Sequence, residues 1–465
     1  MKKTTRGVVA FSAALFALTF VGCSSKTESG VNPEKNKSVV GYYTFDEGVS
    51  DNEIKDHSPA KSDVVGNAFN GGETQAGVKG NALTFGGDEF IQLDNNVLSG
   101  DGFTFAAWVK SDSWKMWNRV FDIGGGDGTK DIFLAVDGRI AGTFTVYEQS
   151  SGAHVNAPLT PIRKWVHLAA TFGNGKVALY VNGKLAEEAD LDLSMKDIAE
   201  ADGVYIGRSN WAADPLFKGA MDEIVVAKTV FSAEQIEELY KANASADTGS
   251  VNVADAKPFK LSDAKATATY YTFDDGVNPI DSVSGINSTT NATETTSGHS
   301  GNAIVLNGDE QFIELNKDLF ASDGITISLW VNPTEFNDWS RIFDLGDQAT
   351  DAWLGKDPAG KLRIDVNGPS GNISLVGELP QNGTWTHVAV TLGNDEAALY
   401  VNGKMAMNGG TELTPAVLAK TATGLYLGRS NWPDPYFNGK MDDVLIIQRA
   451  LSEAEIASVF KGIEK

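Results

Sequence analysis

The chain has 465 residues and a formal net charge of −23, with 61 Asp and Glu against 38 Lys and Arg. Its length suggests two to three domains, and 42% hydrophobic and 21% charged residues are ordinary for a globular protein. So acidic a chain argues strongly against nucleic-acid binding, because phosphate contacts need basic patches, and it disfavours anionic substrates.

The amino-terminal segment predicts a signal for export and lipid attachment. Three basic residues precede an apolar run from 7 to 21, which is shorter than a membrane span requires. Residues 20–23 (Phe-Val-Gly-Cys) then resemble a bacterial lipobox, and Cys23 is the only cysteine of the chain. We expect residues 1–22 to be removed and Cys23 to carry lipid, with residues 23–37 as a flexible tether. An ordinary signal peptide with an incidental cysteine is the alternative.

The remainder of the chain is two copies of one design. Matching segments are 42–48 and 270–276 (Tyr-Tyr-Thr-Phe-Asp-Glu/Asp-Gly), 117–122 and 339–344 (Trp-x-Arg-Val/Ile-Phe-Asp), 165–167 and 385–387 (Trp-x-His), 179–184 and 399–404 (Leu-Tyr-Val-Asn-Gly-Lys), and 207–222 and 428–442 (Gly-Arg-Ser-Asn-Trp, then Asp-Pro, then Met-Asp). Two domain-sized copies indicate a tandem duplication. We expect a first domain at 38–242, a linker at 243–268 and a second domain at 269–465.

Each copy has the sequence pattern of a β-sandwich. Residues 103–109 and 325–331 are rich in aromatic and β-branched residues, and residues 166–172 alternate between larger and smaller or polar side chains. Asn182-Gly183 and Asn402-Gly403 suit type I′ hairpin turns, since both positions need a positive φ.

One short helix is expected at the end of each copy. Ser232 with Gln235, and Ser452 with Glu455, fit capping boxes. Many strands separated by turn signals in about 200 residues predict two packed sheets.

Taken together, the motifs resemble the laminin-G-like, concanavalin A-like jelly-roll family of bacterial extracellular proteins, over nearly all of both copies. The resemblance implies an all-β fold of two tandem concanavalin A-like jelly-roll β-sandwiches, each ending in a short helix. It also implies a role as a carbohydrate-binding or accessory module, often with a structural calcium.

Catalysis is not expected. Glucanases of this fold carry a Glu-x-Asp-x-Glu-like strand with two working carboxylates. Residues 188–192 (Glu-Ala-Asp-Leu-Asp) lack the last Glu, and the counterpart at 408–412 keeps nothing of the pattern, so we interpret it as a solvated strand face. His167 and His387 have no adjacent Ser or Cys nucleophile and are interpreted as structural. The glycine-rich residues 124–128 lack the Lys-Ser/Thr of a phosphate loop and predict a turn.

Two sets of aromatic and polar residues are candidates for carbohydrate binding, because sugars need a flat apolar face and planar hydrogen-bonding groups. They are Trp117, Arg119, Arg208, Asn210 and Trp211 in the first copy, and Trp339, Arg341, Arg429, Asn431 and Trp432 in the second. Trp114 is a further candidate platform. The alternative is a structural corner in which Arg stacks on Trp and pairs with Asp122 or Asp214.

Calcium is the predicted cofactor, since it prefers several carboxylate and carbonyl oxygens in loops. The candidate ligands lie at the two ends of each copy, with Asp56 and Asp281 as further contributors. They are Asp46 and Asp222 in the first copy, and Asp274 and Asp442 in the second. Ordinary acidic turn residues are the alternative.

The sequence thus predicts a lipid-anchored, extracytoplasmic protein with two lectin-like domains that binds a polysaccharide or glycan, as an accessory to its capture or degradation. Ser24 and Ser25 after the cysteine, with no Asp, favour the outer membrane of the cell envelope. The first alternative is an adhesion or spacer module with a protein partner, and the second is an unrecognised hydrolase or lyase.

Overall fold

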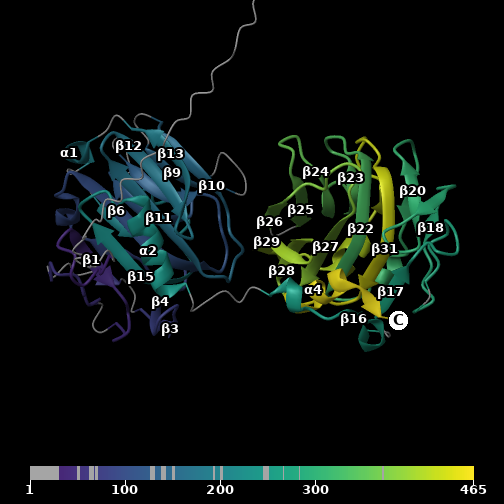
Figure 1. Ribbon diagram of the computed structural model, residues 1–465, viewed down its shortest axis with the longest axis horizontal. Helices are drawn as coiled ribbons and strands as arrows, with labels where there is room; N and C mark the ends of the chain where they lie inside the picture. The colour runs from purple at the N-terminus through teal and green to yellow at the C-terminus, as the bar shows by residue number, and fades with distance from the viewer. Residues whose placement is uncertain are drawn as a thin grey trace, which may run out of the picture.

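Two β-sandwiches, one for each sequence copy, lie side by side in the computed structural model (Figure 1). The structure describes residues 31–49, 53–61, 67–68, 72–125, 131–137, 143–148, 152–191, 194–198, 203–244, 251–264, 267–281, 283–368 and 371–464. The expected signal peptide and Cys23 lie outside these residues, and so does part of the glycine-rich turn at 124–128. Among the described helices, none has the length and apolar character needed to cross a membrane.

The first domain packs an eight-stranded antiparallel sheet on a seven-stranded one. In order, the first sheet is β13 (Lys184–Asp190), β12 (Lys176–Val181), β11 (Val166–Gly173), β6 (Gly102–Ser111), β15 (Gly219–Ala227), β4 (Asn81–Phe85) and β3 (Thr74–Ala76), with β1 (Val39–Tyr43) also paired to β15. The second is β10 (His154–Pro158), β9 (Thr143–Glu148), β8 (Ile132–Val136), β7 (Arg119–Gly124), β14 (Gly203–Ile206), β5 (Ile91–Leu93) and β2 (Asn67–Ala68). Their facing sides bury one continuous core that includes Phe105, Phe121 and Leu168.

The second domain repeats this arrangement. Its eight-stranded sheet is β19 (Thr295–Ser297), β20 (Asn302–Asn307), β31 (Asn438–Ile447), β22 (Ile325–Glu335), β27 (Thr386–Gly393), β28 (Glu396–Val401) and β29 (Lys404–Gly410), with β17 (Ala268–Tyr271) paired to β31. The seven-stranded sheet is β18 (Thr289–Thr290), β21 (Ile313–Glu314), β30 (Gly424–Leu427), β23 (Arg341–Gly346), β24 (Asp351–Lys356), β25 (Leu362–Gly368) and β26 (Gly371–Gly377). The predicted all-β double jelly roll is therefore confirmed.

The helices in the described part of the chain are few and short. They are α1 (Met195–Ile198), α2 (Ala233–Asn243), α3 (Pro415–Thr421) and α4 (Glu453–Lys461), with 3₁₀ turns η1 (Asn95–Leu98), η2 (Val253–Asp255), η3 (Leu261–Ala264) and η4 (Lys317–Phe320). Both predicted capping boxes form at the starts of α2 and α4. Both Asn-Gly turns join adjacent strands with φ values of 49° and 74°, and of 50° and 76°, as a type I′ turn requires.

The expected linker at 243–268 is only partly a linker. Phe259 and Leu261 are buried against α4, and β16 (Phe259–Lys260) pairs in parallel with β32 (Ile463–Glu464). The Ala-, Ser- and Asp-rich composition of the segment indicated a linker, and its few apolar residues gave no pattern that predicted their burial. Its second half belongs to the second domain.

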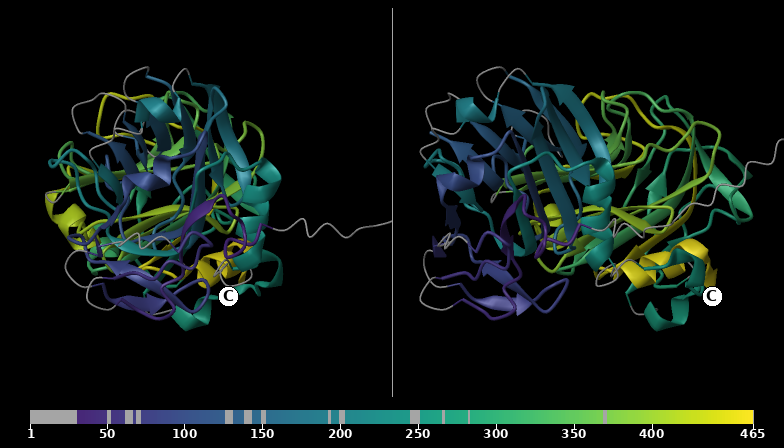
Figure 2. Two further views of the ribbon diagram at one scale, coloured as in Figure 1. Left: turned by 90° about the vertical axis from the view of Figure 1, so that its left-hand side faces the viewer. Right: turned by 60° about the vertical axis from the view of Figure 1, so that its left-hand side comes forward.

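Side-chain contacts also join the two domains, which stand beside each other in the right-hand view of Figure 2. A first-domain loop between β10 and β11 reaches the edge of the second domain. There the Ile162 N–H donates to Asn408 Oδ1 at 2.6 Å, and Arg163 and Lys164 pair with Glu396 and Glu453 at 2.8 and 3.0 Å. The domains are therefore joined by side-chain contacts as well as by the chain that runs between them.

Candidate functional site

Each seven-stranded sheet carries a row of aromatic and polar residues on the face turned away from the core. Side chains alternate along a strand, so residues between core positions must face outward. The cross-strand partners in order are Tyr205, Asp122, Phe133, Tyr147 and His154 in the first domain, and Tyr426, Asp344, Trp353, Asp365 and Ser374 in the second. We call these the first and second outer rows.

Arg119 lies over the first outer row and is almost fully buried, with 2% of its surface exposed. Its Nε donates to Asp122 Oδ2 at 2.7 Å, its Nη2 lies 3.0 Å from Asp214 Oδ2, and its Nη1 donates to the Trp117 carbonyl at 2.7 Å. The guanidinium carbon lies 3.9 Å from the centre of the Phe133 ring. Each terminal nitrogen thus already has a protein acceptor.

Asn210 completes this network rather than facing outward. Its Nδ2 donates to Asp122 Oδ1 at 2.6 Å and to the Gly203 carbonyl at 3.4 Å. Burial raises the pKa of Asp122, while the charge of Arg119 and the hydrogen bond from Asn210 oppose that rise.

The second domain builds the same corner with small differences. Arg341 Nη2 donates to Asp434 Oδ2 at 2.9 Å and Nη1 to the Trp339 carbonyl at 2.8 Å, while Nε stays 3.8 Å from Asp344. The N–H and Nδ2 of Asn431 donate to the two Asp344 oxygens at 3.0 and 2.8 Å. In both corners the Arg and Asn side chains bond to Asp carboxylates of their own domain.

The tryptophans of these corners are the accessible part. Trp339 and Trp432 are 38% and 44% exposed, and Trp117 and Trp211 are half-buried. The Arg119 guanidinium carbon lies 5.7 Å from the ring centres of both Trp117 and Trp211. We call Trp117 with Trp211, and Trp339 with Trp432, the first and second aromatic rims.

The backbone at one tryptophan of each rim is strained. Trp117 and Trp339 have φ values of 62° and 64°, a region that residues with a side chain seldom adopt. Such strain persists only where surrounding contacts enforce it, and it gathers at functional sites. Here both ends of the Trp backbone are held: its N–H donates to the carbonyl of Val136 or Lys356, and its carbonyl accepts from the buried Arg.

Three predicted residues lie apart from the rims. Arg208 stacks on Phe90 and Tyr205 at 4.5 and 4.7 Å, and Arg429 does the same on the equivalent aromatic residues of the second domain. Trp114 donates from Nε1 to the Thr160 carbonyl at 2.9 Å, close to the domain boundary. In each predicted set, the structure therefore places four of the five residues in one corner, and only Arg208 or Arg429 lies apart.

Sequence reasoning missed the centre of the second outer row. Trp353 lies 3.7 Å from the Arg341 guanidinium carbon, and Arg363 holds Asp365 by two hydrogen bonds of 2.6 and 2.7 Å. Burial raises the pKa of the neighbouring Asp351 to about 6. The alternation of polar and apolar residues along 351–367 was the available signal.

Neither of the two buried histidines, His167 and His387, is in a position to act on a substrate. Burial lowers the pKa of both His167 and His387 to about 3, so both are neutral near pH 7. Contrary to the sequence-based expectation, a serine does contact one of them, because Ser328 Oγ lies 2.8 Å from His387 Nε2. Both partners are 1% exposed, and the equivalent of Ser328 in the first domain is Ala106, so no substrate reaches this pair.

The four carboxylates predicted to bind calcium hold turns of their own chain. Asp222 accepts three backbone N–H groups, from Val78, Lys79 and Glu223, at 2.9, 3.2 and 2.7 Å. Asp442 accepts three in the same way, and Asp46 and Asp274 each accept one, from Asn81 and Asn302. Each of these carboxylates therefore has a structural role in its turn, whereas calcium binding remains an expectation from the sequence. Within the described ranges, no three His, Cys, Asp or Glu side chains gather as a metal site needs.

Comparison with known proteins agrees with this architecture. A family model described as the concanavalin A-like lectin/glucanases superfamily (Laminin_G_3) matches residues 85–237 and 307–457, which together exceed half of the chain. No curated protein sequence matches the chain.

Several solved structures are similar to parts of the chain. Domain 4 of AbnA, a GH43 extracellular arabinanase from Geobacillus stearothermophilus in complex with arabinotriose, is 25% identical, covering 42% of this chain and 99% of its own, with a TM-score of 0.35. The CBM40 of the Ruminococcus gnavus IT-sialidase bound to alpha2,3 sialyllactose is 18% identical, covering 35% and 95%, with a TM-score of 0.30. Domains LG4-5 of the mouse laminin alpha1 chain are 11% identical, covering 76% and 86%, with a TM-score of 0.26. On the strength of the family model, the chain belongs to the concanavalin A-like lectin/glucanase superfamily, with two copies of its domain in tandem.

Proposed function

We propose that this protein binds carbohydrate, without catalysis, through the two aromatic rims and the outer rows beside them. The observation that carries the proposal is the same in both domains. In each corner a buried Arg bonds an Asp side chain and the carbonyl of a strained Trp, and a second accessible Trp completes the rim. Packing alone does not require large aromatic rings to be kept at the surface, whereas stacking on a sugar ring does.

The second domain offers the better site. Its Trp339 and Trp432 are the more exposed pair, and the partly exposed Arg363, which also contacts Trp353, offers a hydrogen-bonding group on the same face. The ligand is a neutral or weakly charged glycan, because a chain of charge −23 repels polyanions at low salt. One or two stacked rings with exposed hydrogen bonds correspond to a Kd of roughly millimolar to micromolar, or about −4 to −8 kcal/mol.

The setting we propose follows from the amino-terminal sequence. Lipid on Cys23 would place the two domains at the cell envelope, at the outer membrane, as an accessory to polysaccharide capture or degradation. Mass spectrometry of the mature amino terminus tests this: a diacylated or triacylated Cys23 supports it, and an unmodified start elsewhere refutes it.

Affinity electrophoresis tests the binding site. Residues 31–465 would be run in gels that contain arabinan, xylan, mannan or mixed-linkage glucan. We expect Trp339→Ala and Trp432→Ala to reduce retention while leaving the melting temperature within a few degrees of the parent. Trp117→Ala and Trp211→Ala report whether the first domain also binds.

Two outcomes would count against the proposal. Folded Trp variants that are retained as the parent is would place the site elsewhere. Retention of the parent by no glycan, together with capture of a protein partner that soluble sugar does not displace, would favour adhesion instead.

A further inference from the structure

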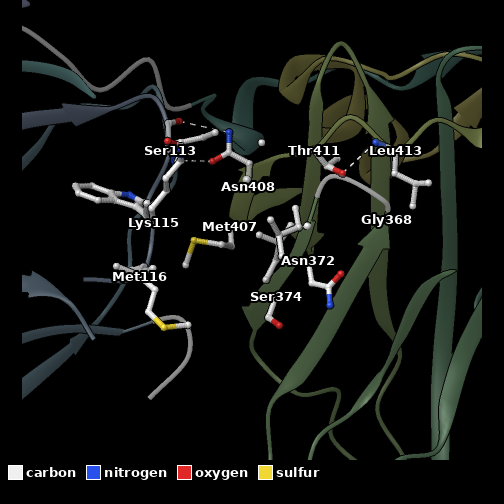
Figure 3. A pocket seen from close by; sticks show the side chains of 18 of the residues that line it. Ser113, Lys115, Met116, Gly368, Asn372, Ser374, Met407, Asn408, Thr411 and Leu413 are labelled. Atoms are coloured by element: carbon white, nitrogen blue, oxygen red, sulfur yellow. Dashed lines mark hydrogen bonds between the residues drawn. The ribbon is translucent and has the colours of Figure 1, made fainter. Parts of the chain in front are cut away.

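A cleft of about 980 Å³ lies between the two domains (Figure 3). The first domain lines it with residues 113–116, the end of β8 and the loop before β11. The second domain lines it with Gly368, residues 371–375 of β26, residues 407–410 of β29 and residues 411–413. Met116 and Met407 face the gap from its two sides in Figure 3.

The contacts around the cleft fix its two walls relative to each other. Asn408 is 5% exposed and bonds both the N–H and the carbonyl of Ile162, at 2.6 and 3.4 Å. The ion pairs of Arg163 and Lys164 with the second domain flank this bond. The cleft is therefore part of the structure rather than a chance gap between freely moving domains.

The cleft continues the surface that contains the proposed sites. Ser374 is the last residue of the second outer row, and both it and Asn372 line the cleft. On the opposite wall Met116 lines the cleft, and the next residue is Trp117 of the first aromatic rim. From Tyr426 to Ser374 the row crosses four strand spacings, or roughly 19 Å, which is room for several sugar rings.

The lining has the chemistry of a glycan-binding surface. Met116 is 60% exposed and offers an apolar contact, while Asn372, Ser374 and Thr411 offer amide and hydroxyl groups. The charged residues of the lining are Lys115 against Asp137, Asp395 and Glu412. This excess of carboxylates disfavours a polyanion and favours a neutral chain.

We propose that the cleft binds the middle of one linear, neutral polysaccharide chain, whose flanking sugars lie on the two aromatic rims. The proposal rests on the proposed function and adds its ligand class: a linear chain long enough to cross both domains. Because the walls are fixed, binding at one rim positions the chain for the cleft and the other rim. Long fragments should then bind more tightly than short ones.

Calorimetry on residues 31–465 with trisaccharides and decasaccharides of arabinan, xylan and β-glucan tests this. We expect the parent to bind the decasaccharide at least about tenfold more tightly than the trisaccharide. Thr411→Trp on the second-domain wall and Met116→Glu on the first-domain wall should each abolish that advantage and leave trisaccharide affinity unchanged, because neither residue belongs to a rim or to an outer row. Thr296→Trp is the matched control, because Thr296 is a partly exposed threonine of the second domain that does not line the cleft.

The outcomes separate this inference from the one on which it rests. Folded Thr411→Trp and Met116→Glu proteins that keep the full advantage of the decasaccharide would overturn the role of the cleft while the rims stand. A parent that binds both lengths equally would do the same. A parent that binds neither length would overturn the proposed function, and the inference with it.

Discussion

Asn408 in the second domain and Ile162 in the first exchange two hydrogen bonds across the domain boundary, and Asn408 is buried in doing so. The equivalent residue in the first domain is Glu188, since both follow the same cross-strand pairing, with Ala398 and Ala178. Glu188 is exposed and pairs only with Lys176 among the contacts described. One position of the duplicated fold has thus become a contact between the copies.

Asn408→Ala should loosen the domain arrangement without unfolding either domain. It leaves the buried Ile162 N–H without its acceptor, at a cost of about 1–3 kcal/mol to the interface. We expect a larger radius of gyration by small-angle X-ray scattering and an unchanged circular dichroism spectrum. Glu188→Ala is the control and should alter neither. A scattering profile identical to that of the parent would show that the other contacts hold the domains by themselves.

The buried arginines should be essential to stability and the stacked ones should not. Arg119→Ala strands Asp122 as an unpaired buried carboxylate, which typically costs about 3–5 kcal/mol, and Arg341→Ala should act similarly on the second domain. Among the contacts that the described residues make, Arg208→Ala removes a stacking contact on Phe90 and Tyr205, worth about 0.5–1 kcal/mol. Urea unfolding measures all three. Equal losses for Arg119→Ala and Arg208→Ala would contradict this division of roles.

Features set by a few neighbouring residues were predictable from the sequence. The Asn-Gly turns and the Ser-x-x-Gln and Ser-x-x-Glu caps form as expected, because each depends on the local backbone. The two strands rich in aromatic and β-branched residues, 103–109 in β6 and 325–331 in β22, also form. The duplication itself indicated which motifs belong together.

Features set by tertiary packing were not predictable in the same way. Arg208 and Asn210 are two residues apart, yet Arg208 stacks over Tyr205 while Asn210 turns to Asp122. Their directions follow from the turn after β14, which no local pattern fixes. Ser328 meets His387 only through strand register, and Asn408 meets Ile162 only because the domains dock.

The turn held by Asp222 offers a direct test of the calcium prediction. Since the Asp222 oxygens already accept three N–H groups, we expect EDTA to leave the melting temperature unchanged. Asp222→Ala should lower it, because buried N–H groups lose their acceptor at about 1–3 kcal/mol. A fall with EDTA that calcium reverses would instead show a metal site, and Asp222→Ala would then reveal whether this carboxylate belongs to it.

The buried histidines should make both domains less stable in acid. The pKa of His167 and of His387 is about 3 in the folded protein, because burial penalises the imidazolium, against about 6.5 when unfolded. Between these values the unfolded chain binds more protons, so the free energy of unfolding falls as pH drops from about 6.5 toward 3. Each histidine contributes a slope of up to about 1.4 kcal/mol per pH unit.

A difference measurement is needed to see this effect. Burial raises the pKa of Asp222 and Asp442 to about 7, and groups with a raised carboxyl pKa act in the opposite direction over an overlapping pH window. We therefore compare urea unfolding of the parent and of a His167→Gln/His387→Gln protein from pH 4 to 7, since glutamine keeps a polar side chain that cannot take a proton. The stability lost by the double variant should be greatest at pH 7 and shrink steadily toward pH 4. A loss that stays constant across this range would mean that the histidines are not held neutral by burial.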